Sequence, residues 1–335
     1  MITLSDLHSA QSLLHGTTSR TRLIELDLGV PHVSPPLRDV GTFAPKADRL
    51  LYLKPENQQP IGAFKLRGAY NKIASLSEAD RKRGVISYSS GNHAQGVAYA
   101  ARALGVKAII VMPSNAPAIK REATAKLGAE IVVVGPGSDE RKAKAEELAA
   151  QNAYVIVPPY ADEKIIAGQG TIGLEILEDL PEVDAVFSPV GGGGLISGVA
   201  AAIKLTNPKV KVIGVEPELA ADAEASMRAG KIVQFPADQV SRTIADGLRT
   251  QSVGAINFEH IRNYVDDIIT VTEDEIRQAM MLLAANPATV AEPSGAVATA
   301  GFLFRGDQLP GTKTNVAIIS GGNIEPEMLQ ALKQP

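Results

Sequence analysis

The sequence predicts an α/β protein with two doubly wound open-sheet domains. The first observation is that short runs of aliphatic and β-branched residues recur along the chain, and stretches with helical periodicity lie between them. The second is that several of these runs are continuously apolar, among them residues 108–111 and 131–134. Continuous apolar runs are typical of parallel strands that are covered on both faces. Strands that alternate with helices also imply right-handed β-α-β units.

The expected elements follow one another in a regular order. The buried strands are predicted at Gly84–Tyr88, Ala108–Met112, Glu130–Val134, Tyr154–Val157, Ala185–Pro189, Lys211–Glu216 and Val316–Ser320. The helices between them are predicted at Ala94–Leu104, Ala116–Leu127, Asp139–Gln151 and Leu195–Lys204. A capping box at Thr272–Glu275 predicts a further helix that runs through Leu283.

The 335 residues are enough for two domains. Residues 84–161 hold several strand–helix units of their own, so we expect a small domain there, inserted into a large domain formed by residues 1–83 and 162–335. In open α/β sheets, ligands bind at the carboxyl ends of the strands. Three polar or glycine-rich segments directly follow predicted strands and can meet in one crevice: 89–92, 191–194 and 320–323.

The composition excludes several classes of function. The chain carries 33 basic and 37 acidic residues, and only 4% of its residues are aromatic, with no Trp. It also lacks a basic stretch with interleaved aromatic residues, which argues against nucleic-acid binding. The absence of Cys excludes disulfides, zinc–thiolate sites and cysteine nucleophiles. The amino terminus does not read as a secretory signal, and no apolar run is long enough to span a membrane, so we expect a cytoplasmic enzyme.

The segment Ile61–Tyr70 places one lysine among apolar neighbours. Lys65 lies between Phe64 and a leucine, and a desolvated amine can act as a nucleophile. A lysine taken alone is far more often a solvated surface residue. Lys65 stands out because a polar loop, Ser89–His93, and a four-glycine run, Gly191–Gly194, follow it. A lysine, a polar loop and a phosphate-binding glycine run are the parts that a pyridoxal 5′-phosphate (PLP) site requires.

The glycine run lies between the predicted strand 185–189 and the predicted helix 195–204. Glycines let backbone amides approach a phosphate closely, and a helix N-terminus adds positive potential. A tight turn without a ligand is the plainer interpretation. A dinucleotide site is a weaker rival, because Glu216 lies where an NAD-ribose acid would sit, but Ile196 and Ser197 break the G-x-G-x-x-G pattern.

Further motifs complete the set: Ile166–Thr171, Thr243–Gly247, Glu292–Ala296 and Ser320–Asn323. Together, the segments resemble the serine/threonine dehydratase and serine racemase group of fold-type-II PLP enzymes, which are relatives of the tryptophan synthase β chain. The similarity runs from about Thr18 to Asn323, which is nearly the whole chain. It implies a fold in which PLP lies in the cleft between two domains.

The resemblance implies a role for each matched residue. Lys65 would be a catalytic residue that also holds PLP covalently, and Ser90 would act as acid or base on the opposite face of the cofactor. The other implied cofactor-binding residues are Phe64, Asn92, Gly191, Gly192, Gly193, Gly194, Leu195, Glu292 and Ser320. The implied substrate-binding residues are Ser89, Ser90, Gly91, Asn92, His93 and Arg141. Taken alone, His93 reads as a packed or capping residue rather than a catalytic one.

Ser320 has a chemical consequence in this scheme. It would hydrogen-bond the pyridine nitrogen of PLP, and a neutral hydroxyl leaves that nitrogen largely unprotonated. The cofactor is then a weaker electron sink, which favours prompt loss of a β-hydroxyl over aminotransferase chemistry. The plainer interpretation of Ser320 is a strand-end serine that starts a Gly-Gly turn.

A metal site is also implied by the resemblance. Glu216, the carbonyl of Ala220 and Asp222 match the spacing of a divalent-cation site in the same group. Oxygen ligands suit Mg²⁺ or Ca²⁺, with Mn²⁺ as a further option. Two solvated carboxylates on a loop are the plainer interpretation. An ion bound there would be structural, because nothing in the sequence puts it beside Lys65.

The reaction implied by the resemblance is β-elimination by a threonine/serine ammonia-lyase (dehydratase). Serine racemase activity, alone or together with elimination, is the nearest alternative. Arg141 opens a third, the dehydration of 3-hydroxyaspartate, whose far carboxylate an arginine could pair. The context of Lys65 and the loop Ser89–His93 disfavour cysteine synthase-like β-replacement, and threonine synthase activity is likewise disfavoured.

Two rivals come from other classes, an NAD-dependent dehydrogenase and a catalytically silent PLP-binding protein. The partners expected are a small amino-acid substrate and a second copy of the chain in a homodimer, without nucleic acid or membrane. Because the sequence ends shortly after Asn323, we do not expect an isoleucine-sensing regulatory domain.

Overall fold

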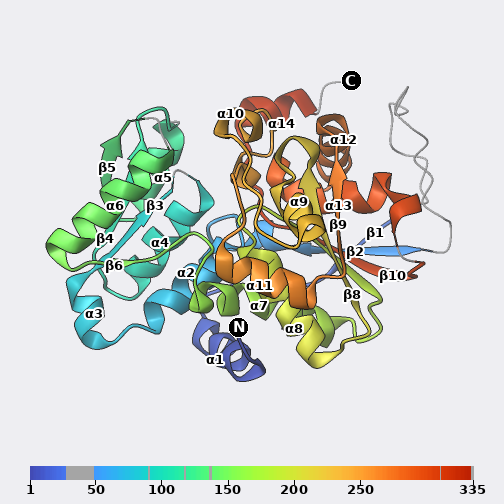
Figure 1. Cartoon of the computed structure of the whole chain (residues 1–335), viewed down its shortest axis with the longest axis horizontal. Helices are drawn as coiled ribbons and strands as arrows, with labels where there is room; N and C mark the ends of the chain where they lie inside the picture. Colours follow the sequence, from blue (N-terminus) through green and yellow to red (C-terminus); the bar gives the residue numbers. More distant parts are fainter. Residues whose placement is uncertain (28–48, 90, 117, 136–137, 310, 333–335) are drawn as a thin grey trace.

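The computed structural model describes residues 1–27, 49–89, 91–116, 118–135, 138–309 and 311–332. These residues form two sheets, which lie side by side in Figure 1. The six-stranded sheet has the order β1-β2-β10-β7-β8-β9, and the four-stranded sheet has the order β5-β4-β3-β6. All pairs are parallel except β1 with β2.

The larger sheet takes its strands from both ends of the sequence. Its strands are β1 (Ile24–Leu26), β2 (Leu50–Pro55), β7 (Ala185–Pro189), β8 (Lys211–Pro217), β9 (Asp267–Val271) and β10 (Thr314–Ile319). Helices cover both faces. The helices of this part are α1 (Leu4–Leu14), α2 (Lys65–Ala74), α7 (Glu163–Asp179), α8 (Gly194–Thr206), α9 (Asp222–Ala229), α10 (Ala237–Val240), α11 (Ala255–Tyr264), α12 (Glu273–Leu283), α13 (Pro293–Phe304) and α14 (Pro326–Leu332).

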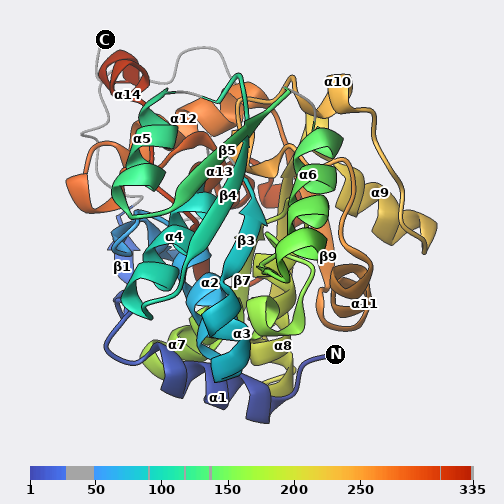
Figure 2. The ribbon, with the colours of Figure 1, turned by 90° about the vertical axis from the view of Figure 1, so that its left-hand side faces the viewer.

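The smaller sheet is formed by one continuous stretch of the sequence. Its strands are β3 (Val85–Tyr88), β4 (Ala108–Pro113), β5 (Glu130–Val134) and β6 (Val155–Ile156). Its helices are α4 (Asn92–Ala103), α5 (Ala118–Lys126) and α6 (Ser138–Asn152), and α3 (Glu78–Arg83) directly precedes β3. Figure 2 views the molecule from this side, with α4 and α6 flanking the sheet. Because residues 84–161 have their own sheet and an apolar cluster of their own around Ile86 and Val111, we propose that they form the small domain, as predicted.

The seven predicted strands are confirmed, with ends shifted by one or two residues at most. Three strands were not predicted, namely β1, β2 and β9. In β2, Lys54 and Pro55 interrupt the apolar pattern, although Lys54 is fully buried. The capping box of Thr272 is present and starts α12 as predicted.

The prediction that residues 131–134 are covered on both faces is wrong. β5 is an edge strand of the smaller sheet, and Val133 is 50% exposed. The run is rich in valine because β-branched side chains fit a pleated surface, which does not require burial on both faces. A continuous apolar run therefore predicted the strand correctly but not its place in the sheet.

Glycines bring the helices beneath the larger sheet very close together. A Cβ atom on Gly168 of α7 would lie 2.7 Å from the carbonyl oxygen of Arg67 in α2, and one on Gly170 would lie 2.8 Å from the carbonyl oxygen of Gly198 in α8. Only hydrogen fits at such distances, so α7 packs backbone to backbone against both neighbours. This packing fixes the position of α2, which begins at Lys65.

Candidate active site

Lys65 is held at the end of a central strand of the larger sheet. The backbone amide of Phe64 donates to the carbonyl of Ser320 at 3.0 Å, and Ala63 forms an isolated β-bridge with Gly321. Ser320 directly follows β10. The contact therefore joins two residues of the predicted site, Phe64 and Ser320, that are far apart in the sequence.

The amine of Lys65 lies in a nearly uncharged environment. Its Nζ donates to the carbonyl oxygen of Pro159 at 2.8 Å and lies 5.2 Å from the centre of the Phe64 ring. Burial lowers the pKa of Lys65 from 10.5 to about 8. A substantial part of the amine is then neutral at slightly alkaline pH, which is the form that attacks a carbonyl or accepts a proton.

The glycine run connects β7 to α8 and cannot carry side chains. Gly193 has a φ of +89°, in the left-handed region. A Cβ atom on Gly192 would overlap the ring of Tyr160, and one on Gly194 would lie 2.8 Å from the Cβ atom of Tyr160. The run thus places backbone amides at the N-terminus of a long helix, where a dianion is stabilised. These features fit the phosphate of PLP.

The segment Pro159–Tyr160 connects the lysine to the glycine run. Pro159 accepts the hydrogen bond from Lys65, and the next ring packs on Gly192. Asn257 supports both parts, because its Nδ2 donates to the carbonyl of Tyr160 at 3.2 Å and its Cβ lies close to Gly193. Sequence reasoning did not select these three residues. The segment follows the predicted strand 154–157, so the rule about strand ends could have found it.

A second group of side chains joins the two sheets near Ser320. Asn92, the first residue of α4, donates from Nδ2 to Oε1 of Glu292 at 2.6 Å. Asn323 donates from its own Nδ2 to Oδ1 of Asn92 at 2.7 Å. Burial, helped by the carboxylate of Asp246, raises the pKa of Glu292 to about 7. The structure thus brings Asn92 and Glu292 together beside Gly321, the residue after Ser320, and their roles toward a cofactor stay a prediction.

Ser320 is buried and hydrogen-bonded through its hydroxyl group. Its Oγ donates to the carbonyl of Ser294 at 3.4 Å, and the Oγ of Ser294 accepts from the amide of Gly247 at 2.9 Å. A Cβ atom on Gly191 would lie 3.3 Å from the carbonyl oxygen of Gly247. The loop around Gly247 therefore lies between the end of β10 and the glycine run.

The predicted substrate loop follows β3, but its central residue lies outside the described residues. That residue is Ser90. Ser89 accepts a hydrogen bond from the amide of Gly91 at 3.3 Å. His93 is buried and donates from Nε2 to the carbonyl of Val157 at 3.1 Å, and burial, together with the charge of Lys65, lowers its pKa to about 3. His93 is therefore neutral at physiological pH and has the packed environment that its sequence context indicated.

Arg141 lies on α6, which packs against β3 and β4. Its side chain is half-buried, and this burial lowers its pKa. Its role toward a substrate stays a prediction.

The predicted metal residues lie at the end of β8. Glu216 and Asp222 are both fully buried, and both carboxylate oxygens of Asp222 lack a hydrogen-bond partner among the described residues. Glu216 accepts from the amides of Ala223 at 3.1 Å and Glu224 at 2.8 Å. Burial, together with the charge of Asp222, raises the pKa of Glu216, and burial raises that of Asp222 to about 7.

Two neighbouring buried carboxyl groups with no basic side chain paired to them among the described residues fit a divalent cation held by oxygen atoms. Among the described residues there is no cluster of three or more His, Cys, Asp or Glu side chains that could hold a metal. The predicted set therefore rests on these two carboxylates and the carbonyl of Ala220.

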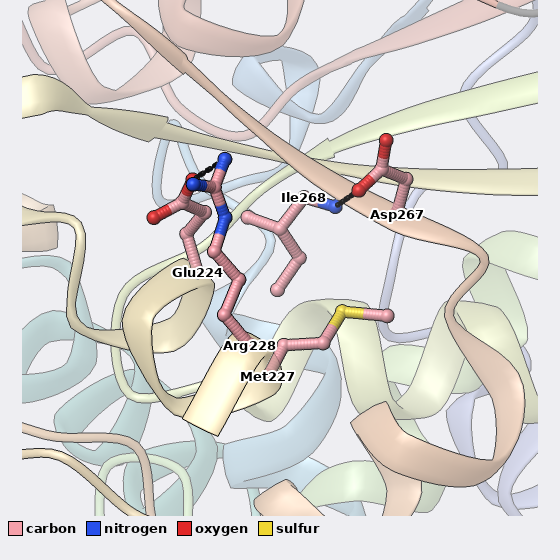
Figure 3. Close-up of a pocket in the computed structure, with 5 residues that line it drawn as sticks. All are labelled: Glu224, Met227, Arg228, Asp267 and Ile268. Carbon is pink, nitrogen blue, oxygen red and sulfur yellow. Dashed lines mark hydrogen bonds and ion pairs between the residues drawn. The ribbon is translucent and has the colours of Figure 1, made fainter. Parts of the chain in front are cut away.

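A small hollow lies between α9 and β9 (Figure 3). It has a volume of about 100 Å³ and is lined by Glu224, Met227, Arg228, Asp267 and Ile268. Glu224 and Arg228, one turn apart on α9, form an ion pair. Ligand pockets for small molecules occupy roughly 300–1,000 Å³, so the hollow is too small for a cofactor and a substrate. None of the predicted site residues lines it.

No described helix has the length and apolar character needed to cross a membrane.

Comparison with known proteins gives one consistent result. Residues 32–321 match the family described as "Pyridoxal-phosphate dependent enzyme". The chain is 45% identical to an L-threonine ammonia-lyase of Thermotoga maritima over 332 residues, which cover 99% of this chain and 78% of that protein. It is 44% identical to an L-threo-3-hydroxyaspartate ammonia-lyase of Saccharomyces cerevisiae over 281 residues, which cover 83% and 85% of the two chains.

A solved structure shows the same fold. The serine racemase of Dictyostelium discoideum superposes with a TM-score of 0.86 at 35% sequence identity, over 97% of this chain and 99% of that one.

Proposed function

Because this chain belongs to the family of pyridoxal-phosphate-dependent enzymes, we propose that it is a threonine/serine ammonia-lyase. It converts L-threonine to 2-oxobutanoate and L-serine to pyruvate, each with release of ammonia. The observation that carries the proposal is the amine of Lys65, which is partly buried, has a pKa lowered to about 8, and lies between the ends of β10 and β6. The identity with the ammonia-lyase of Thermotoga maritima supports the choice of reaction.

When bound, PLP supplies an electron sink that stabilises negative charge at the α-carbon of the amino acid. Lys65 would hold the cofactor, and its neutral amine would take the α-proton of the substrate. The amides of Gly191–Gly194 and Leu195 would hold the phosphate, and Ser320 would give the pyridine nitrogen an uncharged partner. The β-hydroxyl leaves with a proton as water, and hydrolysis of the resulting enamine gives the 2-oxo acid and ammonia.

The loop from Ser89 to His93 holds the substrate carboxylate in this proposal. Its amides lie at the N-terminal end of α4, which favours an anion. Asn92 would contact the 3′ oxygen of the cofactor, and in the described structure its amide group donates to Glu292. Glu292, with a pKa of about 7, can donate or accept a hydrogen bond at the cofactor ring.

Racemisation is a second candidate, favoured by the structural similarity to serine racemase. It requires a proton donor on the face opposite Lys65, and we assign that role to Ser90. Ser90→Ala should slow the racemisation of L-serine at least about tenfold more than its dehydration. Equal losses of both activities would make Ser90 a general binding residue.

Dehydration of 3-hydroxyaspartate is a third candidate, favoured by the yeast relative. Arg141 would pair with the second carboxylate of that substrate. Arg141→Met should then raise KM for L-threo-3-hydroxyaspartate and leave KM for L-threonine nearly unchanged.

Two further proposals concern the state of the enzyme. We infer that Glu216, Ala220 and Asp222 bind Mg²⁺, or Ca²⁺ or Mn²⁺, and that the ion is structural. We also propose a cytoplasmic homodimer, in keeping with the absence of Cys, and light scattering of the purified protein would give its oligomeric state.

A visible spectrum of the purified enzyme, followed by addition of L-serine, D-serine, L-threonine and L-threo-3-hydroxyaspartate, tests the function. A band near ~410–420 nm that changes on addition of L-threonine, with formation of 2-oxobutanoate, supports the ammonia-lyase proposal. A cofactor band without any 2-oxo acid from these substrates would overturn it.

A further inference from the structure

The side chain of Arg67 lies in a cluster of four buried charges behind the active lysine. The four residues are Lys54, Glu56, Arg67 and Glu175, and we call them the Arg67 cluster. Arg67 is 1% exposed and Glu56 0%. Two cations and two carboxylates leave the cluster with no net charge. The proposed reaction does not use any of the four side chains.

Arg67 holds both carboxylates at once. Its Nε and one terminal nitrogen donate to the two oxygens of Glu56 at 2.7 and 2.8 Å. Its two terminal nitrogens donate to the two oxygens of Glu175 at 2.7 and 2.9 Å. Such bidentate pairs fix both the position and the plane of the guanidinium group, whereas the single ammonium group of a lysine could not do so.

The remaining hydrogen bonds of the cluster connect it to further segments of the chain. Lys54 donates to Oε2 of Glu175 and to the carbonyl of Thr21, both at 2.6 Å. The hydroxyl of Thr21 donates to Oε1 of Glu56 at 2.7 Å, and Gln59 donates to its other oxygen at 3.1 Å. The cluster thus connects the end of β2, the segment before β1, helix α2 and helix α7.

The pairing of Glu56 with Arg67 closes a loop that contains Lys65. Glu56 directly follows β2, and Arg67 lies in the first turn of α2, two residues after Lys65. The far side of this loop is attached to the end of β10 through Phe64 and Ser320. The lysine therefore lies on a short segment that is held at the strand end on one side and by the Arg67 cluster on the other.

Stability alone gives little reason for such a cluster. Burying charges costs several kcal/mol per ion in desolvation, and apolar side chains of similar volume often stabilise a protein as well or better. What the cluster does supply is a fixed geometry for the first turn of α2. Lys65 needs it, because it must reach both the cofactor and the α-proton, and a misplacement of about 1 Å can cost a hundredfold in rate.

We propose that Arg67 is a positioning residue for Lys65, which acts by holding the first turn of α2 between Glu56 and Glu175. The turnover readout of this proposal rests on the ammonia-lyase activity proposed above. The cofactor readout does not, because it needs only bound PLP.

The test compares variants of the PLP-loaded enzyme by kcat, KM and the circular dichroism of the visible cofactor band. Arg67→Lys keeps the charge and removes the bidentate geometry. It should lower kcat about a hundredfold, change KM less than about threefold, and at least halve the dichroism of the bound cofactor. Glu56→Gln is isosteric and should show the same pattern with a loss of kcat of about tenfold.

Lys54→Met is the matched control, because it removes a charge of the same cluster and leaves both pairs of Arg67 in place. It should unfold at a lower urea concentration but keep kcat within about threefold and the dichroism unchanged. Wild-type kcat and dichroism in Arg67→Lys or Glu56→Gln would overturn the proposal. The proposal would also be overturned if kcat fell in proportion to the loss of stability in all three variants, or if neither Arg67→Lys nor Glu56→Gln folded. A cofactor band without turnover in the wild type would count against the proposed function, and the dichroism would still test Arg67.

Discussion

The Arg67 cluster and the Lys65 site each bury a lysine, but the two amines have different hydrogen-bond partners. Lys54 lies at the end of β2 with the carboxylate of Glu175 at 2.6 Å, so burial, which lowers its pKa, is opposed by a countercharge. Among the described residues, the amine of Lys65, at the start of α2, donates only to the carbonyl of Pro159, and burial lowers its pKa to about 8. A buried lysine is stabilised in its charged form by a nearby carboxylate, and without one its amine is more readily neutral and nucleophilic.

The largest expected effect is that of replacing Lys65. Lys65→Ala should abolish turnover and the visible cofactor band, because it removes the amine that would form the covalent link. Its far-ultraviolet circular dichroism should match the wild type, since the only side-chain hydrogen bond of Lys65 among the described residues is the one to Pro159. Absorbance spectra and assays of 2-oxo acid formation measure both. Retained turnover above about 1% of the wild-type rate would contradict the assignment.

The next largest effect tests the glycine run as the phosphate-binding segment, with Lys65 left in place. Gly192→Val places a side chain where the ring of Tyr160 lies, so the loop must move away from the amine. The affinity for PLP should fall at least about a hundredfold, measured by titration of the apoenzyme. Gly306→Ala is the control, because a Cβ atom there has open space around it. An unchanged affinity in Gly192→Val would remove the glycine run from the cofactor site.

The smallest effect concerns a third kind of buried charge, the pair Glu216 and Asp222, where like charges face each other. Without cations, Asp222→Asn should raise Tm by a few degrees relative to the wild type. Because folding raises the pKa of Asp222 from 3.8 to about 7, the destabilisation by its carboxyl group builds up as pH rises between these two values and is complete above about pH 7. The difference should be largest above pH 7 and vanish below about pH 4.

Added Mg²⁺ should reverse the order of the two proteins. It should raise the Tm of the wild type and leave that of Asp222→Asn unchanged, because ligands stabilise only the state that binds them. Equal shifts in both proteins would exclude the carboxylate pair as the cation site.

Sequence reasoning predicted the fold class, the PLP family and the central strands, and the comparisons confirm them. It succeeded where a local sequence pattern is sufficient to predict an element, as in the apolar runs of β4 and β7 or the glycine run before α8. It failed at β2, because Lys54 interrupts the apolar pattern and its partner Glu175 lies 121 residues away in the sequence, so the pairing appears only after folding.

The parts of the candidate site that were missed share one property. Pro159 acts through its backbone carbonyl and Tyr160 through the shape of its ring, so neither presents a chemical group that a motif search would select. Arg67 was visible in the segment Ile61–Tyr70, but its partners Glu56 and Glu175 lie on either side of it in the sequence. Sequence patterns reveal chemical groups more readily than the contacts that hold them in place.

The most direct test of the role of Lys65 is the pH dependence of cofactor incorporation. The apoenzyme, prepared by removal of PLP, is mixed with PLP at a series of pH values from 6 to 11, and the rate at which the visible band forms is recorded. If a neutral Lys65 amine attacks the cofactor, the rate should rise with pH and reach half of its maximum near about pH 8, and Lys65→Ala should show no band at any pH. A midpoint near 10.5, the value of an ordinary lysine, or a band in Lys65→Ala would contradict the account.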